Sequence, residues 1–326
     1  MTVRFGILGA GRILGKLGPA YRAARGVRLV AIASREIARA EAAAREHGAE
    51  RAYGSYEALL ADGDVDVVHN ALHNGLHCEW TVRALEAGKH VLCEKPLACS
   101  DAEVERMFAV AHARRRVLME GFMYRFHPQM QEALRRVQAG ELGQPLHIRA
   151  CYATRGREPG NPRYWPEAGG GALMDVGCYC VNASLLFAGC APQRVTANAR
   201  FANGVDMTLS GMLDFGGGLT AHILCSFELE GVYRLEVVGT EAKLEIPNPW
   251  SPPEGQGEFW VTRGGRAEVF RQAAGRPFAS FVAEIEHFAE CVRDSSVAPL
   301  VTEADSRLTM RVIGQLRQAA QQGFVP

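Results

Sequence analysis

The sequence has no excess of either charge and no long apolar run. Its 326 residues include 36 Lys and Arg and 36 Asp and Glu, so the formal net charge is zero. A neutral chain creates no global field that would attract nucleic acid or an anionic membrane. It also lacks the run of about 18 apolar residues of a membrane span and the basic, then apolar, start of a secretory leader. We therefore expect a cytoplasmic protein that acts on a small molecule, without nucleic-acid or membrane partners.

The cysteines show no metal-binding or disulfide pattern. The nine cysteines are an odd number, and none has a paired zinc spacing. His69, His73 and His77 recur every four residues, but residues 65–72 are predicted to form a strand, in which this spacing does not build a zinc geometry. The expected metal content is none. Cys178 and Cys180 are best explained as small buried residues.

The first 121 residues alternate short apolar runs with segments of helical periodicity. With 48% hydrophobic and 22% charged residues, the chain has the composition of a folded protein of about two domains. Alternation of this kind predicts a parallel sheet with helices on both faces, which binds ligands at the carboxyl ends of its strands. Ser100 and Glu103 form a capping box before one of the helices. The expected strands are 3–8, 27–33, 65–72, 90–93 and 117–120, and the expected helices are 12–24, 37–47, 55–61, 79–87 and 100–114.

From Phe122 onward the pattern changes to strands joined by short turns. Such patterning predicts an antiparallel meander, and helices before and after it make an α+β domain. The expected strands are 146–153, 194–201, 207–215, 219–227, 233–238 and 259–262, and the expected helices are 128–139, 278–293 and 303–321.

A glycine turn follows the first predicted strand. Gly9 and Gly11 let a pyrophosphate approach the backbone closely, and the start of the next helix offers amide donors to it. A plain tight turn is the alternative. Leu14 replaces the third glycine of the usual pattern and Gly15 follows it, so we expect the helix to lie slightly farther from the sheet.

Ser34 and Arg35 stand at the end of the second predicted strand, about 23 residues after the glycine turn. An acidic side chain at this place binds the ribose 2′-hydroxyl of NAD, whereas a hydroxyl and a guanidinium suit a 2′-phosphate. Arg35 therefore favours NADP(H) through charge-assisted bonds. Glu36 keeps NAD as the alternative, because a shifted strand end would make it the ribose ligand.

Glu94, Lys95 and Pro96 follow the fourth predicted strand of the first domain. Proline fixes the backbone after Lys95 and permits a cis bond, so the ammonium group can be held beside a bound nicotinamide. A solvated surface lysine is the alternative.

Asp175 and Tyr179 are four residues apart in a segment that follows three glycines. If residues 173–186 are helical, the two side chains lie one turn apart on one face. Tyrosine titrates near pH 10, so acid or base work near neutrality needs a cation, which Lys95 can supply. A buried tyrosine bonded to a helix carboxylate is the alternative.

The loop before the three glycines is rich in arginine and aromatic residues. Such side chains suit a polyhydroxylated ring or a diol and could cover a site, although a solvated connection explains them equally well. The residues concerned are Arg155, Arg157, Arg163, Tyr164 and Trp165.

Five motifs occur in one order, at residues 6–13, 71–77, 87–96, 120–128 and 169–179. Together they resemble the Gfo/Idh/MocA oxidoreductase family over at least residues 3–190. The Asp-x-x-x-Tyr ending is similar to the branch of dihydrodiol dehydrogenases, NADP-dependent aldose dehydrogenases and glucose-fructose oxidoreductase, whereas inositol dehydrogenases have histidine at the position of Tyr179. His73 departs from the family, which usually has proline there.

The resemblance implies an α/β fold of two domains. Residues 1–121 form a Rossmann domain with a doubly wound parallel sheet that binds NADP. Residues 122–326 form an α+β domain with an open, mostly antiparallel sheet, which binds substrate and makes a homodimer or a higher homo-oligomer. The expected catalytic residues are Lys95, Tyr179 and Asp175; the expected cofactor-binding residues are Gly9, Gly11, Arg12, Ile13, Ser34, Arg35, Leu72, Asn74, His77, Glu94, Lys95, Arg163 and Trp165; and the expected substrate-binding residues are Lys95, Tyr124, Asp175 and Tyr179.

The leading hypothesis is an NADP-dependent dehydrogenase or reductase acting on a sugar, cyclitol or vicinal diol. Tyr179 takes the hydroxyl proton, Lys95 stabilises the phenolate and Asp175 orients the group. One alternative is a glycoside hydrolase with tightly bound nicotinamide, which uses transient oxidation and shows no net change in NADPH. Another is a regulatory protein that senses NADP(H) without turnover, and the presence of these three residues argues against it.

Overall fold

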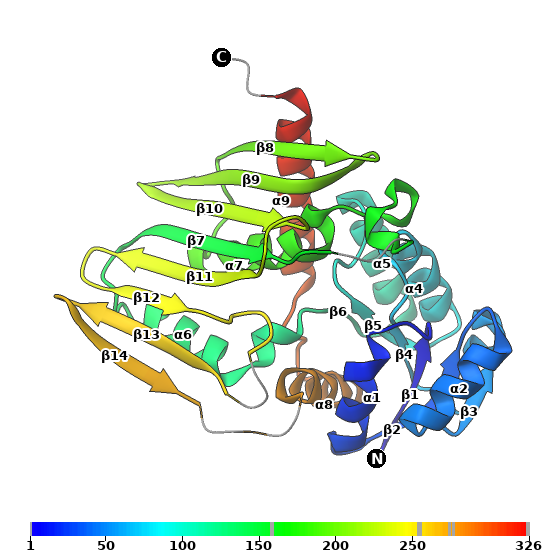
Figure 1. The fold of residues 1–326 in the computed structure, drawn as a ribbon. Coiled ribbons are helices and arrows are strands. Elements are labelled where there is room, and N and C mark those ends of the chain that lie inside the picture. Colours follow the sequence, from blue (N-terminus) through cyan, green and yellow to red (C-terminus); the bar gives the residue numbers. More distant parts are fainter. Residues whose placement is uncertain (1, 157–159, 253–255, 273–274, 276–277, 324–326) are drawn as a thin grey trace. The chain divides into compact units, whose positions relative to one another are not determined.

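The computed structural model describes residues 2–156, 160–252, 256–272, 275 and 278–323. The chain forms two compact units (Figure 1). Unit 1 comprises Met1–Phe126 and Arg276–Arg307, and unit 2 comprises His127–Gly275 and Leu308–Pro326. This division differs from the predicted domains, 1–121 and 122–326, in two ways. The chain leaves unit 1 after Phe126 instead of Gly121, and a later segment returns to unit 1.

Helix α8, Ala279–Arg293, explains that return. It packs against helix α1 and against strands β1 and β2 of the first sheet. Its Phe288 is fully buried, and the ring lies edge-on to Phe5 of β1 with centroids 6.4 Å apart. Periodicity along the sequence locates this helix but does not reveal which sheet its apolar face covers.

Unit 1 contains a six-stranded parallel sheet with strand order β3-β2-β1-β4-β5-β6. Because the order reverses between β1 and β4, the carboxyl ends of these two strands form the switch point at which such sheets bind ligands. The predicted doubly wound sheet is confirmed. The short β3, which contains Arg51, was not predicted. The strands are β1 Val3–Leu8, β2 Val27–Ala33, β3 Arg51–Tyr53, β4 Val67–Asn70, β5 His90–Glu94 and β6 Leu118–Gly121.

The helices of unit 1 begin and end largely where the sequence predicts. Ser100 caps α5 as expected, because its Oγ accepts the Glu103 amide at 3.2 Å. The Glu103 carboxylate accepts the amide of Cys99 at 2.8 Å, one residue before the cap. Besides α8, the helices of this unit are α1 Leu14–Ala23, α2 Ile37–His47, α3 Tyr56–Leu60, α4 His77–Glu86 and α5 Asp101–Arg114, with 3-10 turns η1 Asn74–Leu76 and η2 Met123–Phe126.

Unit 2 contains an eight-stranded sheet with strand order β14-β13-β12-β11-β7-β10-β9-β8. Its neighbours are antiparallel except for β7 and β10, which run parallel, so the expected mostly antiparallel sheet is confirmed. The short strands β12 and β14 were not predicted. The strands are β7 Pro145–Ala153, β8 Arg194–Ala202, β9 Val205–Gly216, β10 Leu219–Ser226, β11 Val232–Gly239, β12 Lys243–Ile246, β13 Glu258–Arg263 and β14 Arg266–Arg271.

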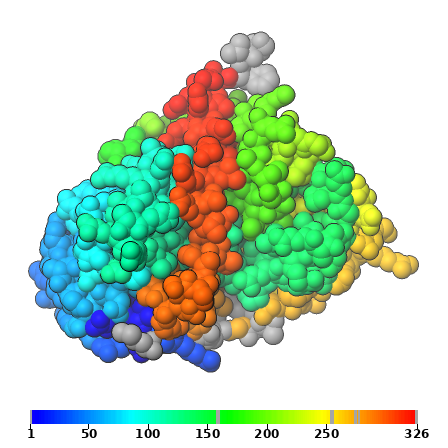
Figure 2. Space-filling model, turned by 180° about the vertical axis from the view of Figure 1, so that it is seen from behind, coloured from blue at the N-terminus to red at the C-terminus, as the bar shows by residue number. Residues whose placement is uncertain are grey.

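Helices cover one face of the unit 2 sheet. Helix α7, Cys178–Ala188, packs on β7 and β10. Helix α9, Glu303–Gln322, lies against β9, where a side chain at Gly211 would come within 2.6 Å of Leu316. The outer side of α9 lies at the surface in Figure 2. Helix α6, Pro128–Gln138, and 3-10 turns η3 Pro162–Tyr164 and η4 Pro166–Ala168 complete this unit.

One helical stretch among the described residues, Pro166–Ala188, is long and apolar enough to cross a membrane, with a mean hydropathy of 1.4. Of that apolar window, 83% is buried inside the structure. Burial of this extent is what a core helix shows, and it agrees with the packing of α7 on the sheet.

Candidate functional site

The glycine turn of unit 1 lies at the carboxyl end of β1. Gly9 has a positive φ of 104°, and a Cβ there would lie 3.0 Å from the Ala71 carbonyl oxygen. A Cβ at Gly11 would meet nothing within 4 Å. Gly9 is therefore required by the fold, whereas Gly11 faces open space, as expected for a backbone that a pyrophosphate approaches. Arg12 and Ile13 complete the turn before α1 and are exposed and half-buried, respectively.

Leu14 does not leave a gap between helix and sheet. It is 2% exposed and belongs to the core, while the Gly15 that follows it is exposed. The close approach made by α1 occurs instead at Gly18, where a Cβ would lie 2.3 Å from His47 Nδ1 of α2. At the position of the missing third glycine, the Leu14 side chain is therefore buried in the core.

The end of β2 carries two guanidinium groups. Ser34 is buried and its Oγ lies 3.4 Å from the Glu36 amide, while Arg35 is exposed. Arg39, one turn into α2, places Nη2 3.5 Å from the Ala10 carbonyl oxygen in the glycine turn. Arg35 and Arg39 are also close enough to Tyr56 that both charges act against the rise in its pKa, which burial causes. The sequence prediction missed Arg39, which lies in the first turn of α2, the helix that follows Arg35.

Glu36, the alternative ribose ligand, precedes the first residue of α2. Its Oε1 lies 3.9 Å from Arg39 Nη1, and its side chain is 70% exposed. Strand β2 ends at Ala33, as predicted, so the strand end is not shifted toward Glu36.

The loop after β4 is held by two buried polar residues. Asn70 donates to the His77 carbonyl oxygen and to Thr81 Oγ1, both at 3.1 Å. The His77 ring lies between two carbonyl oxygens, that of Pro96 at 2.8 Å and that of Leu72 at 3.0 Å. Burial lowers the pKa of His77, which is 1% exposed. His77 thus links the loop of Leu72 and Asn74 to the loop of Lys95, and its ring offers almost no surface to a ligand.

Lys95 follows the last residue of β5 and precedes a cis bond to Pro96. Two residues later, the Leu97 amide donates to Glu120 Oε1 at 2.8 Å. Glu120 is 1% exposed and comes from β6, so a neighbouring strand anchors the loop that presents Lys95. Burial raises the pKa of Glu120 to about 7.

A buried chain of polar groups lies beneath Glu94. The Tyr21 hydroxyl and His69 Nδ1 are 2.8 Å apart, and His69 Nε2 lies 3.3 Å from Glu94 Oε1. His69 is fully buried, and the Glu94 side chain is 12% exposed. Burial, followed by the charge of Glu94, raises the pKa of Glu284 well above its usual range. His69 therefore positions the carboxylate beside Lys95.

In unit 2, the three glycines bring Arg163 close to the start of the segment that carries Asp175 and Tyr179. The Gly171 amide donates to the Arg163 carbonyl oxygen at 2.9 Å, and a Cβ at Gly170 would lie 2.4 Å from the same oxygen. Asp206 of β9 accepts the Leu173 amide at 2.6 Å, and a Cβ at Gly171 would lie 2.2 Å from its Oδ1. Burial raises the pKa of Asp206 to about 6. Close packing thus requires glycine at two of these positions.

Asp175 and Tyr179 do not belong to one regular α-helix. Leu173–Gly177 forms a π-helical turn, and α7 begins at Cys178. A π-turn holds about 4.4 residues in place of 3.6, so residues four apart still face the same side. A Cβ at Gly177 would lie 2.8 Å from Cys225 Sγ, so this turn lies directly on β10. The expected helix is present, but its first turn is wider than predicted.

Asp175 forms an ion pair with Arg163, whose Nε lies 2.7 Å from Asp175 Oδ2. The Asp175 side chain is 13% exposed. Asp175 is the main cause of the raised pKa of Arg163, to which Tyr152 and Tyr179 also contribute. The structure therefore places a cation of unit 2 near Tyr179, in addition to the lysine that the sequence prediction named.

The Tyr179 ring lies in an aromatic cluster. Its centroid is 5.5 Å from that of Tyr152 and 5.8 Å from that of Trp250. Trp250 is 1% exposed and its Nε1 donates to the Cys151 carbonyl oxygen at 3.0 Å. Tyr179 itself is 6% exposed. The rings pack around Tyr179, and they escaped prediction because segments far apart in sequence supply them: Tyr152 lies in β7 and Trp250 after β12.

Other predicted residues lie in varied settings. Tyr124 is fully buried and packs edge-on against Phe122, which is a packing role. Trp165 is 42% exposed, and Arg155 is exposed, 3.8 Å from Glu230. Arg157 lies outside the described residues.

We expect Glu120→Gln to change the pH dependence of stability. The amide oxygen still accepts the Leu97 N–H, but the residue no longer ionises. In the wild type the folded state keeps the Glu120 proton up to about pH 7, whereas the unfolded chain releases it near 4.5. Wild-type stability contributed by this proton is therefore full below pH 4.5 and is lost as the pH rises through 7.

Relative to the wild type, the variant should gain stability between pH 4.5 and 7.5, by up to about 3 kcal/mol. Thermal unfolding across this range, with the exposed Glu41→Gln as control, measures the gain. A difference that stays constant with pH would contradict the raised pKa.

Comparisons with known proteins agree with this architecture. A model of the GFO_IDH_MocA oxidoreductase family, NAD-binding Rossmann fold, matches residues 3–122, and one of the GFO/IDH/MocA C-terminal domain matches residues 130–245. D-xylose 1-dehydrogenase (NADP(+)) 2 of Haloferax volcanii is 39% identical and covers 98% of both chains. Trans-1,2-dihydrobenzene-1,2-diol dehydrogenase of Sus scrofa is 34% identical over 98% of this chain and 97% of its own.

Among solved structures, a tyrosine-to-phenylalanine variant of KijD10, a 3-ketoreductase from Actinomadura kijaniata, was crystallised with TDP-benzene and NADP. It has a TM-score of 0.92 and 32% identity over 98% of both chains. The chain thus belongs, as its motifs predicted, to the Gfo/Idh/MocA family of oxidoreductases.

Proposed function

We propose that this oxidoreductase transfers a hydride between NADP(H) and a carbinol or carbonyl carbon of a sugar, cyclitol or vicinal diol. The observation that carries the proposal is the 2.7 Å ion pair of Arg163 and Asp175 beside Tyr179. It places a phenol, a carboxylate and a cation together, which are the groups needed to move one proton.

Unit 1 has the features that a dinucleotide needs. Gly11 leaves open space at the end of β1, beside the first turn of α1, where a pyrophosphate meets backbone donors. Arg35 and Arg39 stand at the end of β2, where a 2′-phosphate would lie, and Arg39 lies beside Glu36. These charges favour NADP(H) over NAD.

Bound nicotinamide supplies the hydride chemistry, and the chain manages the proton. In oxidation, Tyr179 takes the proton from the substrate hydroxyl; in reduction it returns it. Lys95 stabilises the phenolate, and Asp175, fixed by Arg163, orients the phenol. Glu120 accepts the amide of Leu97, two residues after Lys95, and His69 contacts the carboxylate of Glu94, directly before Lys95.

The solved structures of KijD10 support the assignment of Lys95 and Tyr179. They include variants with a lysine replaced by alanine or glutamate and one with a tyrosine replaced by phenylalanine. In that chain the two positions are 84 residues apart, the same separation as between residues 95 and 179 here.

The relatives support the substrate class. They act on xylose, on a dihydrodiol and on a 3-keto sugar, and a similar structure belongs to an aldose-aldose oxidoreductase. Xylose and the dihydrodiol carry two or more hydroxyl groups, and the 3-keto sugar carries carbonyl groups on its ring. Arg163 and the exposed ring of Trp165 are suited to bind such a molecule, through hydrogen bonds and ring stacking.

Tyr179→Phe should lower turnover by about 100-fold to 10,000-fold while leaving NADPH binding intact, because only the proton donor is removed. Single-turnover kinetics and NADPH fluorescence titration measure the two effects. Tyr233→Phe, a change to an exposed tyrosine on β11, is the control and should keep full activity. Retained turnover in Tyr179→Phe would overturn the assignment.

Arg35→Ala combined with Arg39→Ala should raise the KM for NADP by about 10-fold to 100-fold and leave the KM for NAD nearly unchanged. The two substitutions remove the cationic partners of the 2′-phosphate, which NAD lacks. The assay follows NADPH absorbance with aldoses, cyclitols and cyclic diols, with NAD in parallel. Arg45→Ala, on the same helix, is the matched control. If the wild type turns over only with NAD, the argument from the end of β2 is wrong.

We also propose that the open face of the unit 2 sheet forms a homodimer. On this face His147 bonds to Thr220 at 2.9 Å and Ser210 to His222 at 3.0 Å, so its polar groups are satisfied within the sheet. Met212, 40% exposed, stands between Thr196 and His222 on neighbouring strands. Such a flat, internally bonded face suits a self-complementary contact.

Sedimentation equilibrium should give twice the chain mass of 35.5 kDa for the wild type. Met212→Arg should shift the protein toward monomer, because two like charges would meet at the interface. Arg311→Glu, on the outer side of α9, should leave the dimer unchanged. A wild type that sediments as a monomer would refute the proposal.

A reducing compartment such as the cytoplasm is the proposed location. All nine cysteines, which lie in the described part of the chain, are free thiols, and seven of them are buried.

A further inference from the structure

Unit 1 contains a pocket of about 550 Å³ at the amino edge of its sheet. The pocket lies where β1 and β5 begin and where the segments leading into β4 and β6 approach, so it is at the opposite edge from Gly9 and Lys95. The end of α8 closes it. The lining residues are Thr2, Val3, Gly63, Val65, Asp66, Gly88, Lys89, His90, Arg116, Val292 and Arg293.

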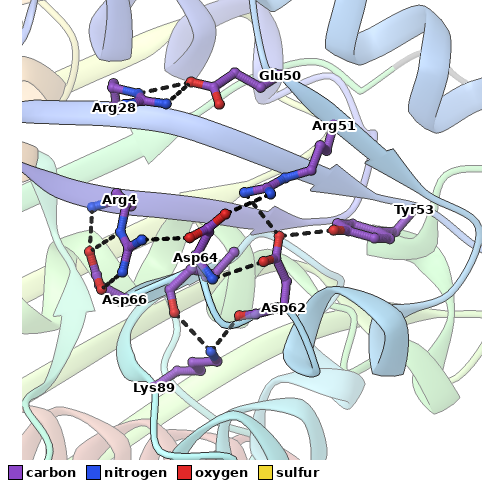
Figure 3. A network of polar contacts seen from close by, with 10 residues as sticks. Arg4, Arg28, Glu50, Arg51, Tyr53, Asp62, Asp64, Asp66 and Lys89 are labelled. Carbon is purple, nitrogen blue, oxygen red and sulfur yellow. Dashed lines mark hydrogen bonds and ion pairs between the residues drawn. The ribbon is translucent and has the colours of Figure 1, made fainter.

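The acidic wall of this pocket is already neutralised, as Figure 3 shows. Arg4 binds Asp66 through Nε at 2.9 Å and Nη2 at 2.7 Å, and binds Asp64 through Nη1 at 2.8 Å. Arg51 pairs with Asp62 at 3.2 Å and with Asp64 at 2.9 Å. The three carboxylates therefore have cationic partners within the network, and this network fixes the loop that forms the wall.

On the basic wall, the charges of Asp62 and Asp66 act on Lys89, whereas the two arginines have no carboxylate partner among the described residues. Lys89 is 8% exposed, and its Nζ donates to the carbonyl oxygens of Asp62 at 2.7 Å and Val65 at 2.8 Å, which leaves a third N–H. Arg116 Nε donates to Gly88 O at 2.6 Å, and Arg293 Nη1 donates to Gly26 O at 3.2 Å. Among the described residues, neither of these two guanidinium groups forms an ion pair with a carboxylate.

These cations act on one another. Burial, and then the charge of Arg116, lowers the pKa of His90 to about 4, so the ring is neutral at pH 7. Burial also lowers the pKa of Lys89; the charges of Asp62 and Asp66 oppose this shift, and the weaker effects of Arg4 and Arg116 add to it. Like charges gathered around a cavity are relieved by an anion.

Helix capping accounts for only part of this arrangement. Arg116 satisfies a carbonyl just after the end of α4, where a cation is favourable. Arg116 Nη1 also donates to the Arg115 carbonyl oxygen at 3.4 Å, so Arg116 uses two of the five N–H groups of a guanidinium and Arg293 uses one. The remaining donors border a pocket whose volume is within the range of small-molecule sites, about 300 to 1,000 Å³.

We propose that this pocket binds a phosphorylated small molecule, with the phosphate held by Arg116, Arg293 and the free donor of Lys89. Guanidinium groups bind phosphate through two parallel bonds, and the volume beyond a phosphate group leaves room for the organic part. The site is separate from the dinucleotide site and does not depend on the proposed function.

Isothermal titration of pyrophosphate into the full-length protein tests the proposal. The wild type should bind, and Arg116→Gln combined with Arg293→Gln should weaken binding by about tenfold or more, as expected when charge-assisted bonds are lost. Arg116→Lys with Arg293→Lys keeps the charges and should retain binding within a few-fold. Thermal unfolding of each variant checks that it is folded.

Two further titrations locate the site. Binding should persist in the Arg35→Ala, Arg39→Ala variant and in the presence of excess NADP. Loss of pyrophosphate binding under either condition places it at the carboxyl edge and overturns the proposal, as does an absence of binding at millimolar pyrophosphate. If NADP itself gives no heat, the proposed cofactor is wrong, while the comparison of the Gln and Lys variants still tests the pocket.

Discussion

In each unit, a buried carboxylate that accepts a backbone N–H fixes the chain beside a proposed catalytic residue. Glu120 accepts the amide of Leu97, two residues after Lys95, and Asp206 accepts the amide of Leu173, two residues before Asp175. Both carboxylates come from strands, and burial raises the pKa of both. Burying a carboxyl group is unfavourable unless it is hydrogen-bonded or protonated. These two residues therefore lower the stability of the fold while they fix a loop. Precise placement of a proton-handling group requires such support, because small displacements strongly reduce the rate.

The sequence predicts the parts of the fold that depend on local pattern. Strand and helix alternation gives the parallel sheet, and the glycine turn, Lys95, Asp175 and Tyr179 stand out as short motifs. Residues that support them, such as Trp250, escaped prediction because they are distant in sequence and carry no motif of their own. The π-turn at Leu173–Gly177 escaped as well, since it depends on how Gly177 packs on β10. Helix α8 was found, but its place in unit 1 depends on tertiary burial of Phe288.

The ion pair of Arg163 and Asp175 changes the electrostatic account of the site. A phenol needs a nearby cation to lose its proton near neutrality, and sequence reasoning gave that role to Lys95 alone. Arg163 is within interaction range of Tyr179 and comes from the same unit. Its charge is offset by Asp175, with which it forms a 2.7 Å ion pair.

The two edges of the parallel sheet solve opposite electrostatic problems. At the carboxyl edge, helix starts and glycines present backbone donors, so the chain itself supplies positive potential for phosphates. At the amino edge, the ends of α4 and α5 present carbonyl groups, and arginine and lysine side chains must supply that potential instead. Arg4 and Arg51 form ion pairs with the aspartates of the loop before β4. Arg116 and Arg293 hold only backbone carbonyls, which do not cancel a full charge, and the remaining charge faces a cavity. An anion is the partner that we propose for this charge.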